Sequence, residues 1–202
     1  MEIVCLDLEG VLVPEIWIAF AEKTGIMELK RTTRDEPDYE KLMAWRMDIL
    51  RSHGLTLSDI QDTISQIHPL EGAYEFLSKL RSITQVVILS DTFKEFASPL
   101  MKQLGWPTIL CNSLVIDENN MLCGMKLRQV DGKRKAIEGF RSMGFRTFAA
   151  GDSYNDLSMI HTADKGCLFR APKNILKEEP NLKLCTTYDE FYSVIESFVK
   201  ED

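Results

Sequence analysis

Two acidic side chains interrupt an otherwise apolar run near the amino terminus. Asp7 and Glu9 lie within residues 5–13, where every other residue apart from Gly10 is apolar. Placing two carboxylates at the end of a buried strand is costly unless a cation or hydrogen-bond donors pair with them. The segment is therefore either a solvent-facing turn, with Gly10 as the turn residue, or part of a site that uses both carboxylates.

A second acidic pair follows another apolar run. Asp152 and Asp156 come directly after the buried-looking segment that ends at Gly151. By themselves, these aspartates and Ser153 or Asn155 are typical of a helix start, where they cap backbone N–H groups and complement the helix dipole. If both acidic segments end parallel strands, however, they meet at one edge of a sheet. Several carboxylates in one cleft need a hard cation, and Mg²⁺ is the expected ion.

A hydroxyl and an ammonium group complete the candidate set. Ser90 ends a further apolar run and can either donate a hydrogen bond to a ligand or cap the following helix. Residues 126–146 hold seven Lys or Arg against two acids, which mostly indicates a solvated helix face. Lys133, at the start of that helix, could instead reach the acidic cleft. There it would offset carboxylate charge and hold an anion such as phosphate.

Two charged residues lie in a long helical stretch between the first two apolar runs. Arg46 has apolar neighbours at helical spacings of three and four, so it either extends outward to water or meets an anion. Glu15 opens the first helix of this stretch, where a carboxylate is favourable for capping alone.

Short apolar runs alternate with helical patterns along most of the chain. The predicted strands are residues 3–8, 85–90, 107–111, 146–151, 166–169 and, more weakly, 184–187. The predicted helices between and after them are residues 73–81, 93–104, 134–143, 156–163 and 188–199. This alternation predicts an α/β fold with a doubly wound parallel sheet, in which ligands bind at the carboxyl ends of the strands.

Residues 14–69 break the alternation. They contain helical patterns at 15–23, 39–51 and 58–67 with little strand signal, whereas a parallel crossover needs only about a dozen residues. We expect a helical cap subdomain at 14–69, inserted into a core formed by residues 1–13 and 70–202. Residues 115–128, with Asn119 and Asn120 at the centre, predict a β-hairpin excursion.

The composition restricts partners and location. The 202-residue chain is 45% apolar and carries a net charge of −7, which argues against a broad nucleic-acid-binding surface. No apolar run approaches the ~18 residues of a membrane span. Five scattered cysteines without CxxC spacing indicate reduced thiols, a cytoplasmic protein and no zinc site. The sequence leaves a homodimer open.

Together, four segments resemble the four motifs of the haloacid dehalogenase-like hydrolases. They are, in order, Asp7-x-Glu9-Gly10-Val11, Ser90, Lys133 and Gly151-Asp152-x-x-x-Asp156. Within that family the chain is similar to the phosphoserine phosphatases through its cap and through residues 69–73 and 151–156. A bifunctional branch, which also transfers phosphate from phosphoserine to homoserine, similarly has Asp-Leu-Glu in motif one and Ser-Asp-Thr in motif two. The resemblance covers nearly the whole chain and implies a Rossmann-like core.

The resemblance also implies a reaction. Asp7 would be the nucleophile that becomes an aspartyl phosphate, and Glu9 would be the acid/base, with its backbone carbonyl on Mg²⁺. Asp7 would share that metal with Asp152, supported by the carboxylate of Asp156. The implied enzyme is a Mg²⁺-dependent phosphomonoesterase that acts on O-phospho-L-serine.

The same resemblance assigns the substrate contacts. Ser90 and Lys133 would hold the phosphate, with Asn155 near it. Arg46 matches the cap arginine that meets the substrate carboxylate, and Glu15 the cap glutamate near the substrate amine.

Three departures from the family pattern bear on the substrate. Glu9 stands where the second acid is usually Asp, and Glu15 falls one place earlier than usual. Asp91 and Thr92 replace two glycines of many phosphoserine phosphatases, and as neighbours of Ser90 they join the predicted substrate-binding set. Another small phosphomonoester, such as a sugar phosphate or a nucleotide, remains an alternative substrate. A phospho-acceptor signalling domain is the alternative from another class.

Overall fold

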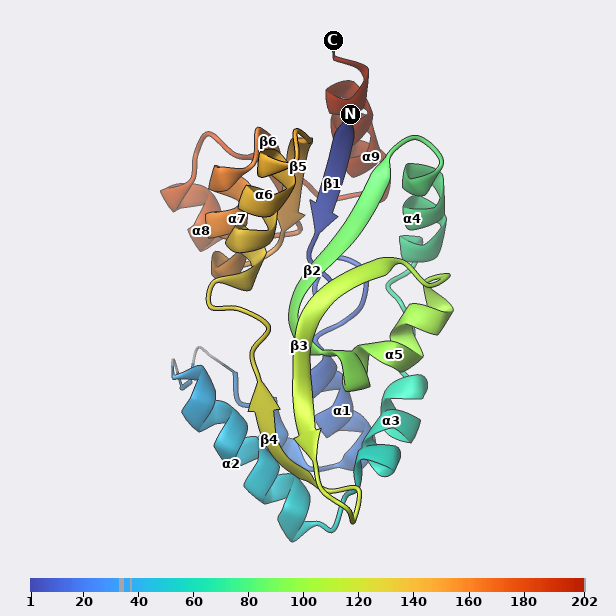
Figure 1. Cartoon of the computed structure of the whole chain (residues 1–202), viewed down its shortest axis with the longest axis vertical. Coiled ribbons are helices and arrows are strands. Elements are labelled where there is room, and N and C mark those ends of the chain that lie inside the picture. The colour runs from blue at the N-terminus through green and yellow to red at the C-terminus, as the bar shows by residue number, and fades with distance from the viewer. Residues whose placement is uncertain (33–34, 37, 202) are drawn as a thin grey trace.

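A seven-stranded sheet forms the centre of the molecule. The computed structural model describes residues 1–32, 35–36 and 38–201. The strands in this part of the chain are β1 (Glu2–Leu6), β2 (Gln85–Phe93), β3 (Thr108–Ile116), β4 (Leu122–Lys126), β5 (Arg146–Gly151), β6 (Lys165–Phe169) and β7 (Lys183–Cys185). Their order is β4-β3-β2-β1-β5-β6-β7, and every pair is parallel except β3 with β4 (Figure 1). The predicted fold class is confirmed.

Helices cover both faces because alternate strand residues point to opposite sides. On one face, Ile3 and Cys5 of β1 pack with α6 (Gly132–Ser142), α7 (Leu157–Thr162) and α8 (Lys173–Glu178). On the other, Val4 and Leu6 belong to the core that includes α4 (Ala73–Arg81), α5 (Lys94–Gln103) and α9 (Tyr188–Lys200). Burial on both sides explains why the strands are continuously apolar.

The strand order reverses between β1 and β5. From β1 the chain proceeds outward through β2 and β3, and it then returns to β5 on the other side of β1. Leu6, the last residue of β1, is level with Ala150 near the end of β5. The segments that follow these two strands therefore lie side by side at the carboxyl edge, where open α/β sheets bind ligands.

Between β1 and α4 the named elements of the described residues are all helices, and Glu9 and Val13 form an isolated β-bridge. The helices are α1 (Ile16–Thr24), the short 3₁₀ helix η1 (Met27–Lys30), α2 (Tyr39–Ser52) and α3 (Leu57–Ser65). They lie beyond the carboxyl end of the sheet, next to the β3–β4 hairpin (Figure 1). The tip of that hairpin contacts α3, because the Leu57 N–H donates to the Asn120 carbonyl at 2.7 Å and the Ser58 N–H donates to Asn120 Oδ1 at 2.9 Å.

The hairpin differs from its prediction in one respect. The predicted strand at 107–111 and the first arm of the hairpin are one continuous strand, β3. Asn112 and Ser113 interrupt the apolar pattern and suggested a break. The side chain of Asn112 is nevertheless buried, donating to the Asp91 carbonyl at 2.9 Å and accepting from the Arg128 N–H at 2.9 Å. Helix α8 had no counterpart among the predicted elements.

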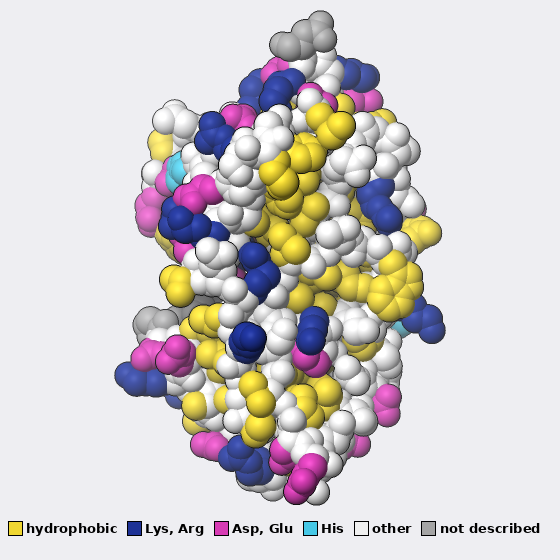
Figure 2. All heavy atoms as spheres, in the orientation of Figure 1, with side chains coloured by type: hydrophobic (Ala, Val, Ile, Leu, Met, Phe, Trp, Pro, Cys, Tyr) yellow, Lys and Arg dark blue, Asp and Glu magenta, His cyan; other side chains and the backbone are white. Residues whose placement is uncertain are grey.

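The surface is not uniform in charge. On the face shown in Figure 2, hydrophobic side chains gather over β1 and β2, and charged side chains concentrate over α6, α7 and α8. The cysteines in the described residues are free thiols. Within the same residues, no helix has both the length and the apolar character that a membrane crossing requires.

Candidate active site

Asp7 is the first residue after β1 and is buried at the carboxyl edge of the sheet. Its N–H continues the strand pairing by donating to the Ala150 carbonyl at 3.0 Å. Its carboxylate accepts a hydrogen bond from the Leu8 N–H at 2.7 Å and lies 3.0 Å from the Lys133 ammonium, in both cases through Oδ1. The strand thus fixes the backbone, while the side chain contacts Lys133 from α6.

Lys133 brings a buried positive charge to the same place. It is the second residue of α6, only 4% exposed, and its Nζ lies 2.7 Å from Asp156 Oδ1. Burial alone would lower the pKa of this ammonium, but the carboxylates of Asp156, Asp7 and Asp91 raise the pKa well above its ordinary value. The structure thus places the Lys133 ammonium between the carboxylates of Asp7 and Asp156.

Asp156 and Asp152 differ in how their carboxylates are used. Asp156 is fully buried, and its Oδ2 accepts the N–H groups of Asp152 and Ser153 at 3.0 Å each, while Oδ1 contacts Lys133. Both of its oxygens are engaged, which suits a supporting role. In the described residues, no other side chain donates to the Asp152 carboxylate, so its oxygens remain available for a ligand.

The carboxylates of Asp7, Asp152 and Asp156 fit a divalent cation. One oxygen from each lies within 4.8 Å of the other two. Burial, and then the charge of Asp156, raise the pKa of Asp7 and bring that of Asp152 to about 7. One ammonium cannot offset three carboxylates, and an all-oxygen donor set is what Mg²⁺ prefers. These three carboxylates therefore suit a hard divalent cation such as Mg²⁺.

Two glycines allow these carboxylates to approach the backbone. Gly10 has a φ of +73°, and a Cβ atom there would lie 2.4 Å from Asp152 Cγ. A Cβ on Gly151 would lie 2.1 Å from Asp156 Cγ. Side chains at either position would displace the acidic groups, so both glycines are part of the site.

Glu9 and Glu15 form a second acidic pair beside the first. Glu9 Oε2 accepts the N–H of Ile16, the first residue of α1, at 2.9 Å. Burial, followed by the nearby charge of Glu15, raises the pKa of Glu9 to about 8. The surroundings of Glu9 therefore favour its protonated form, which suits a general acid.

Arg46 comes from α2, and its side chain is buried. Its guanidinium stacks on Trp17, 4.4 Å from the ring centroid, and donates to the Arg31 carbonyl at 2.7 Å. Burial lowers its pKa to about 10, so it remains charged at neutral pH. Its Nε is buried and has no hydrogen-bond acceptor among the described residues. A buried guanidinium whose Nε–H makes no hydrogen bond in the described residues can bind an anion.

Ser90, Asp91 and Thr92 lie where the pairing of β2 with β3 becomes irregular. The register shifts between Leu89 and Phe93, as in a β-bulge, a feature common beside active sites. The Thr92 N–H donates to Ser90 Oγ at 3.2 Å. Asp91 Oδ2 accepts from Asn155 Nδ2 at 3.0 Å and lies 3.8 Å from Lys133 Nζ. The hydrogen bond between Asp91 and Asn155 therefore links the end of β2 to the loop after β5.

Contacts join five of the predicted residues, Asp7, Asp91, Lys133, Asn155 and Asp156, and the structure adds a residue that the prediction missed. Tyr39, the first residue of α2, donates its hydroxyl hydrogen to the Asp91 carbonyl at 3.3 Å. Burial, with the charges of Asp91 and Glu9, raises its pKa above the ordinary range. Tyr39 precedes Arg46 by two helical turns, so the same-face spacing could have identified it.

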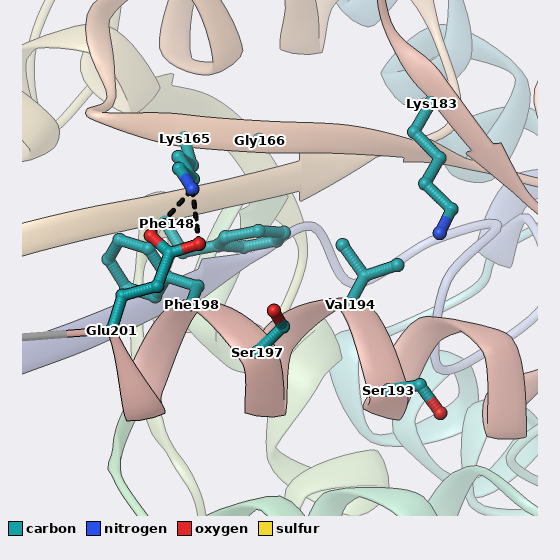
Figure 3. A pocket seen from close by; sticks show the side chains of 9 residues that line it. All are labelled: Phe148, Lys165, Gly166, Lys183, Ser193, Val194, Ser197, Phe198 and Glu201. Atoms are coloured by element: carbon teal, nitrogen blue, oxygen red, sulfur yellow. Dashed lines mark hydrogen bonds and ion pairs between the residues drawn. The ribbon is translucent and has the colours of Figure 1, made fainter.

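A cavity elsewhere in the molecule lacks this chemistry. It has a volume of about 580 Å³ and lies between α9 and the amino ends of β6 and β7, opposite the carboxylate edge (Figure 3). Lys165 at its wall is paired with Glu201 at 2.6 Å. The acidic cluster is therefore the candidate active site. A buried nucleophilic carboxylate, an ammonium and a protonated acid suit transfer of a phosphoryl group.

Known proteins resemble this chain in sequence, and solved structures resemble it in fold. A protein named phosphoserine phosphatase ThrH, from Pseudomonas aeruginosa, is 58% identical over 190 residues, covering 94% of this chain and 93% of the relative. A phosphoserine phosphatase of Pseudomonas syringae pv. tomato is also 58% identical over 190 residues, covering 94% of this chain and 80% of the relative. The solved structure of a substrate-bound phosphoserine phosphatase complex matches with a TM-score of 0.77 at 20% identity, over 97% of each chain. Residues 1–164 match the haloacid dehalogenase-like hydrolase family, and the chain belongs to that family.

Proposed function

We propose that this hydrolase is a phosphoserine phosphatase that works through a phosphorylated Asp7 and also transfers the phosphate to homoserine. The observation that carries the choice of substrate is the buried guanidinium of Arg46, whose Nε has no acceptor among the described residues. The names of the two 58% identical relatives support the same substrate.

The head group of an amino acid matches the charges on this side of the crevice. Arg46 offers a buried cation for the substrate carboxylate, and Glu15 offers a carboxylate for the ammonium. Glu9 and Glu15 are close enough to oppose the effect of burial on the pKa of Arg46. A zwitterion would pair with both groups, whereas a sugar phosphate would leave the buried guanidinium of Arg46 without an anion.

The phosphate would bind between Ser90, Lys133 and Asn155, with its phosphorus atom facing Asp7. In the first step, a carboxylate oxygen of Asp7 forms a bond to phosphorus as the bond to the serine oxygen breaks. Glu9 gives its proton to that leaving oxygen, so serine departs as a neutral alcohol. Lys133 stays protonated and stabilises the charge that develops on the phosphoryl oxygens.

In the second step, an oxygen nucleophile attacks the phosphorus atom of the aspartyl phosphate and releases Asp7. Glu9, now ionised, accepts the proton of the attacking hydroxyl. Water yields inorganic phosphate, and homoserine yields phosphohomoserine. Homoserine carries the same head group as serine, so Arg46 and Glu15 can hold it, which raises its effective concentration over that of an unpositioned nucleophile.

Mg²⁺ bound by Asp7 and Asp152 would supply positive charge that offsets the repulsion between the anionic nucleophile and the anionic phosphate. The helices of residues 14–69 would serve as a cap that excludes bulk water while the ester is cleaved. Arg46, Glu15 and Tyr39 all come from this segment, so closing the cap would also assemble the substrate site.

Phosphorus NMR tests the proposal directly. The enzyme with Mg²⁺ and phosphoserine should release inorganic phosphate over many turnovers, and added homoserine should give phosphohomoserine alongside it. Glu9→Asp should shift the products towards free phosphate, because the shorter acid reaches the larger acceptor less well. Inorganic phosphate alone at saturating homoserine would leave a plain phosphatase. Phosphorylation that stops after one phosphate per chain would indicate a signalling domain instead.

A further inference from the structure

The carboxylate of Asp91 touches two groups that the proposed function gives to the substrate phosphate. Its Oδ2 accepts a hydrogen bond from Asn155 Nδ2 at 3.0 Å, and the same oxygen lies 3.8 Å from Lys133 Nζ. Asp91 therefore holds in this structure the position between Asn155 and Lys133 that a phosphate oxygen would take.

Lys133 does not depend on Asp91 to balance its charge. The ammonium has two nearer carboxylate partners, Asp156 at 2.7 Å and Asp7 at 3.0 Å, and both are buried. The side chain of Asp91, in contrast, is 51% exposed. Lys133 can therefore lose its contact with Asp91 and stay paired, and the half-exposed Asp91 carboxylate can turn into solvent.

The backbone of Asp91 is fixed even though its side chain is half exposed. Its carbonyl accepts hydrogen bonds from Asn112 Nδ2 at 2.9 Å and from the Tyr39 hydroxyl at 3.3 Å. A change of side-chain rotamer is therefore the simplest way for the carboxylate to leave the site, and it needs no movement of the strand.

We infer that Asp91 is an internal competitor for the phosphate-binding groups, and that its carboxylate must swing into solvent before a phosphate can bind. The Asp91 carboxylate and a phosphate cannot both contact Asn155 and Lys133, because two negative charges about 4 Å apart repel each other strongly near a protein surface. The inference rests on the proposed phosphate contacts of Lys133 and Asn155. It assigns Asp91 to the control of affinity and gives its carboxylate no part in holding the phosphate.

Competition of this kind weakens substrate and product alike. Phosphoserine and inorganic phosphate present similar oxygens to Lys133, so Asp91 raises the dissociation constant of both. The return of the carboxylate to Asn155 and Lys133 would help to expel inorganic phosphate after each turnover.

The charge of Asp91 can be removed with little change of shape by the substitution Asp91→Asn. With the Mg²⁺-loaded protein, isothermal titration calorimetry with inorganic phosphate should show a dissociation constant about tenfold lower than that of the wild type. The gain should shrink as salt is raised, because it comes from a half-exposed charge. An unchanged or weaker affinity for phosphate would overturn the inference.

A matched control removes a neighbouring charge that does not face the site. Asp131 precedes α6 in a left-handed conformation that asparagine tolerates, and its carboxylate contacts Arg134 and Ser158. Asp131→Asn should leave the affinity for phosphate within about twofold of the wild type, since its carboxylate is engaged elsewhere. An equal gain in both variants would show a general charge effect and contradict the role of Asp91.

The calorimetric result does not depend on turnover, so the two proposals can fail separately. If phosphoserine is not hydrolysed but Asp91→Asn binds phosphate more tightly, the substrate is wrong and the role of Asp91 stands. If phosphoserine is hydrolysed and the variant binds phosphate no better, only the role of Asp91 falls.

Discussion

The Asp7 carboxylate makes two contacts in the described residues, one with the Leu8 N–H and one with the Lys133 ammonium. Both contacts use Oδ1. The second oxygen, Oδ2, makes neither of these contacts, which suits the nucleophilic role that we propose for it. We expect Asp7→Asn to fold normally, because Lys133 keeps its 2.7 Å contact with Asp156, and to lose activity by about 10³-fold or more. Steady-state release of phosphate measures the loss, and mass spectrometry must exclude deamidation back to Asp. A verified variant with a kcat near that of the wild type would disprove the nucleophilic role.

Arg46 gives a residue-scale test of the substrate. If it pairs with the substrate carboxylate, Arg46→Ala should cost about 2–5 kcal/mol in kcat/KM for phosphoserine. The cost should be much smaller for phosphoethanolamine, which lacks that carboxylate. Arg51 lies on the same helix, is exposed and pairs with Asp48, so Arg51→Ala is the matched control with little expected effect. Equal losses for both substrates would assign Arg46 to packing or to the phosphate.

At the scale of elements, the turn after β1 couples backbone geometry to the acidic cluster. Gly10 and Gly25 have nearly the same φ, +73° and +76°, but only Gly10 lies against Asp152. An alanine at either position should destabilise the fold by about 1–2 kcal/mol through the left-handed backbone. Only Gly10→Ala should also displace Asp152 and weaken Mg²⁺ binding, by about tenfold or more in a titration of activity with Mg²⁺. Similar Mg²⁺ requirements in the two variants would separate this turn from the metal site.

The tip of the β3–β4 hairpin contacts the start of α3. Asn120 at the hairpin tip accepts hydrogen bonds from Leu57 and Ser58 at the start of α3. The inserted helices are thus held at one end by the hairpin, and at the other they reach the site through the contact of Tyr39 with Asp91. If these helices act as the proposed cap, the contacts favour opening at the Tyr39 end while the hairpin end stays in place.

For the whole molecule, the carboxylates at the end of the sheet store repulsion that a cation relieves. An ion that binds only the folded state stabilises it by about 2.7 kcal/mol at 100 times its dissociation constant. Saturating Mg²⁺ should therefore raise the Tm by about 5–10 °C for a chain of this size, and EDTA should abolish turnover. Differential scanning calorimetry with and without Mg²⁺ measures the shift, and Asp152→Asn should reduce it. Full activity and an unchanged Tm in metal-free buffer would exclude the metal site.

Several features could be predicted from the sequence because they depend on local pattern. Apolar runs separated by helical periodicity determine the strands and helices, and the position of Asp7 and Asp152 just after two such runs places them at strand ends. The order of the four motifs then pointed to the family that the comparisons confirm. The boundaries of the cap, the roles of the site residues and the transfer to homoserine stay predictions. They rest on the resemblance and on the proposed chemistry.

Only the tertiary structure decided how these segments meet. Two examples are the pairing of β5 with β1 and the 2.7 Å contact of Lys133 with Asp156, which depend on packing between segments far apart in the chain. The same holds for the continuity of β3, where Asn112 is satisfied by Asp91 and Arg128, and for the contact of Asp91 with Asn155. Local spacing determines which face of an element a side chain occupies. Which partner it finds there is set by burial and by the satisfaction of its charge, and these exist only once the sheet has formed.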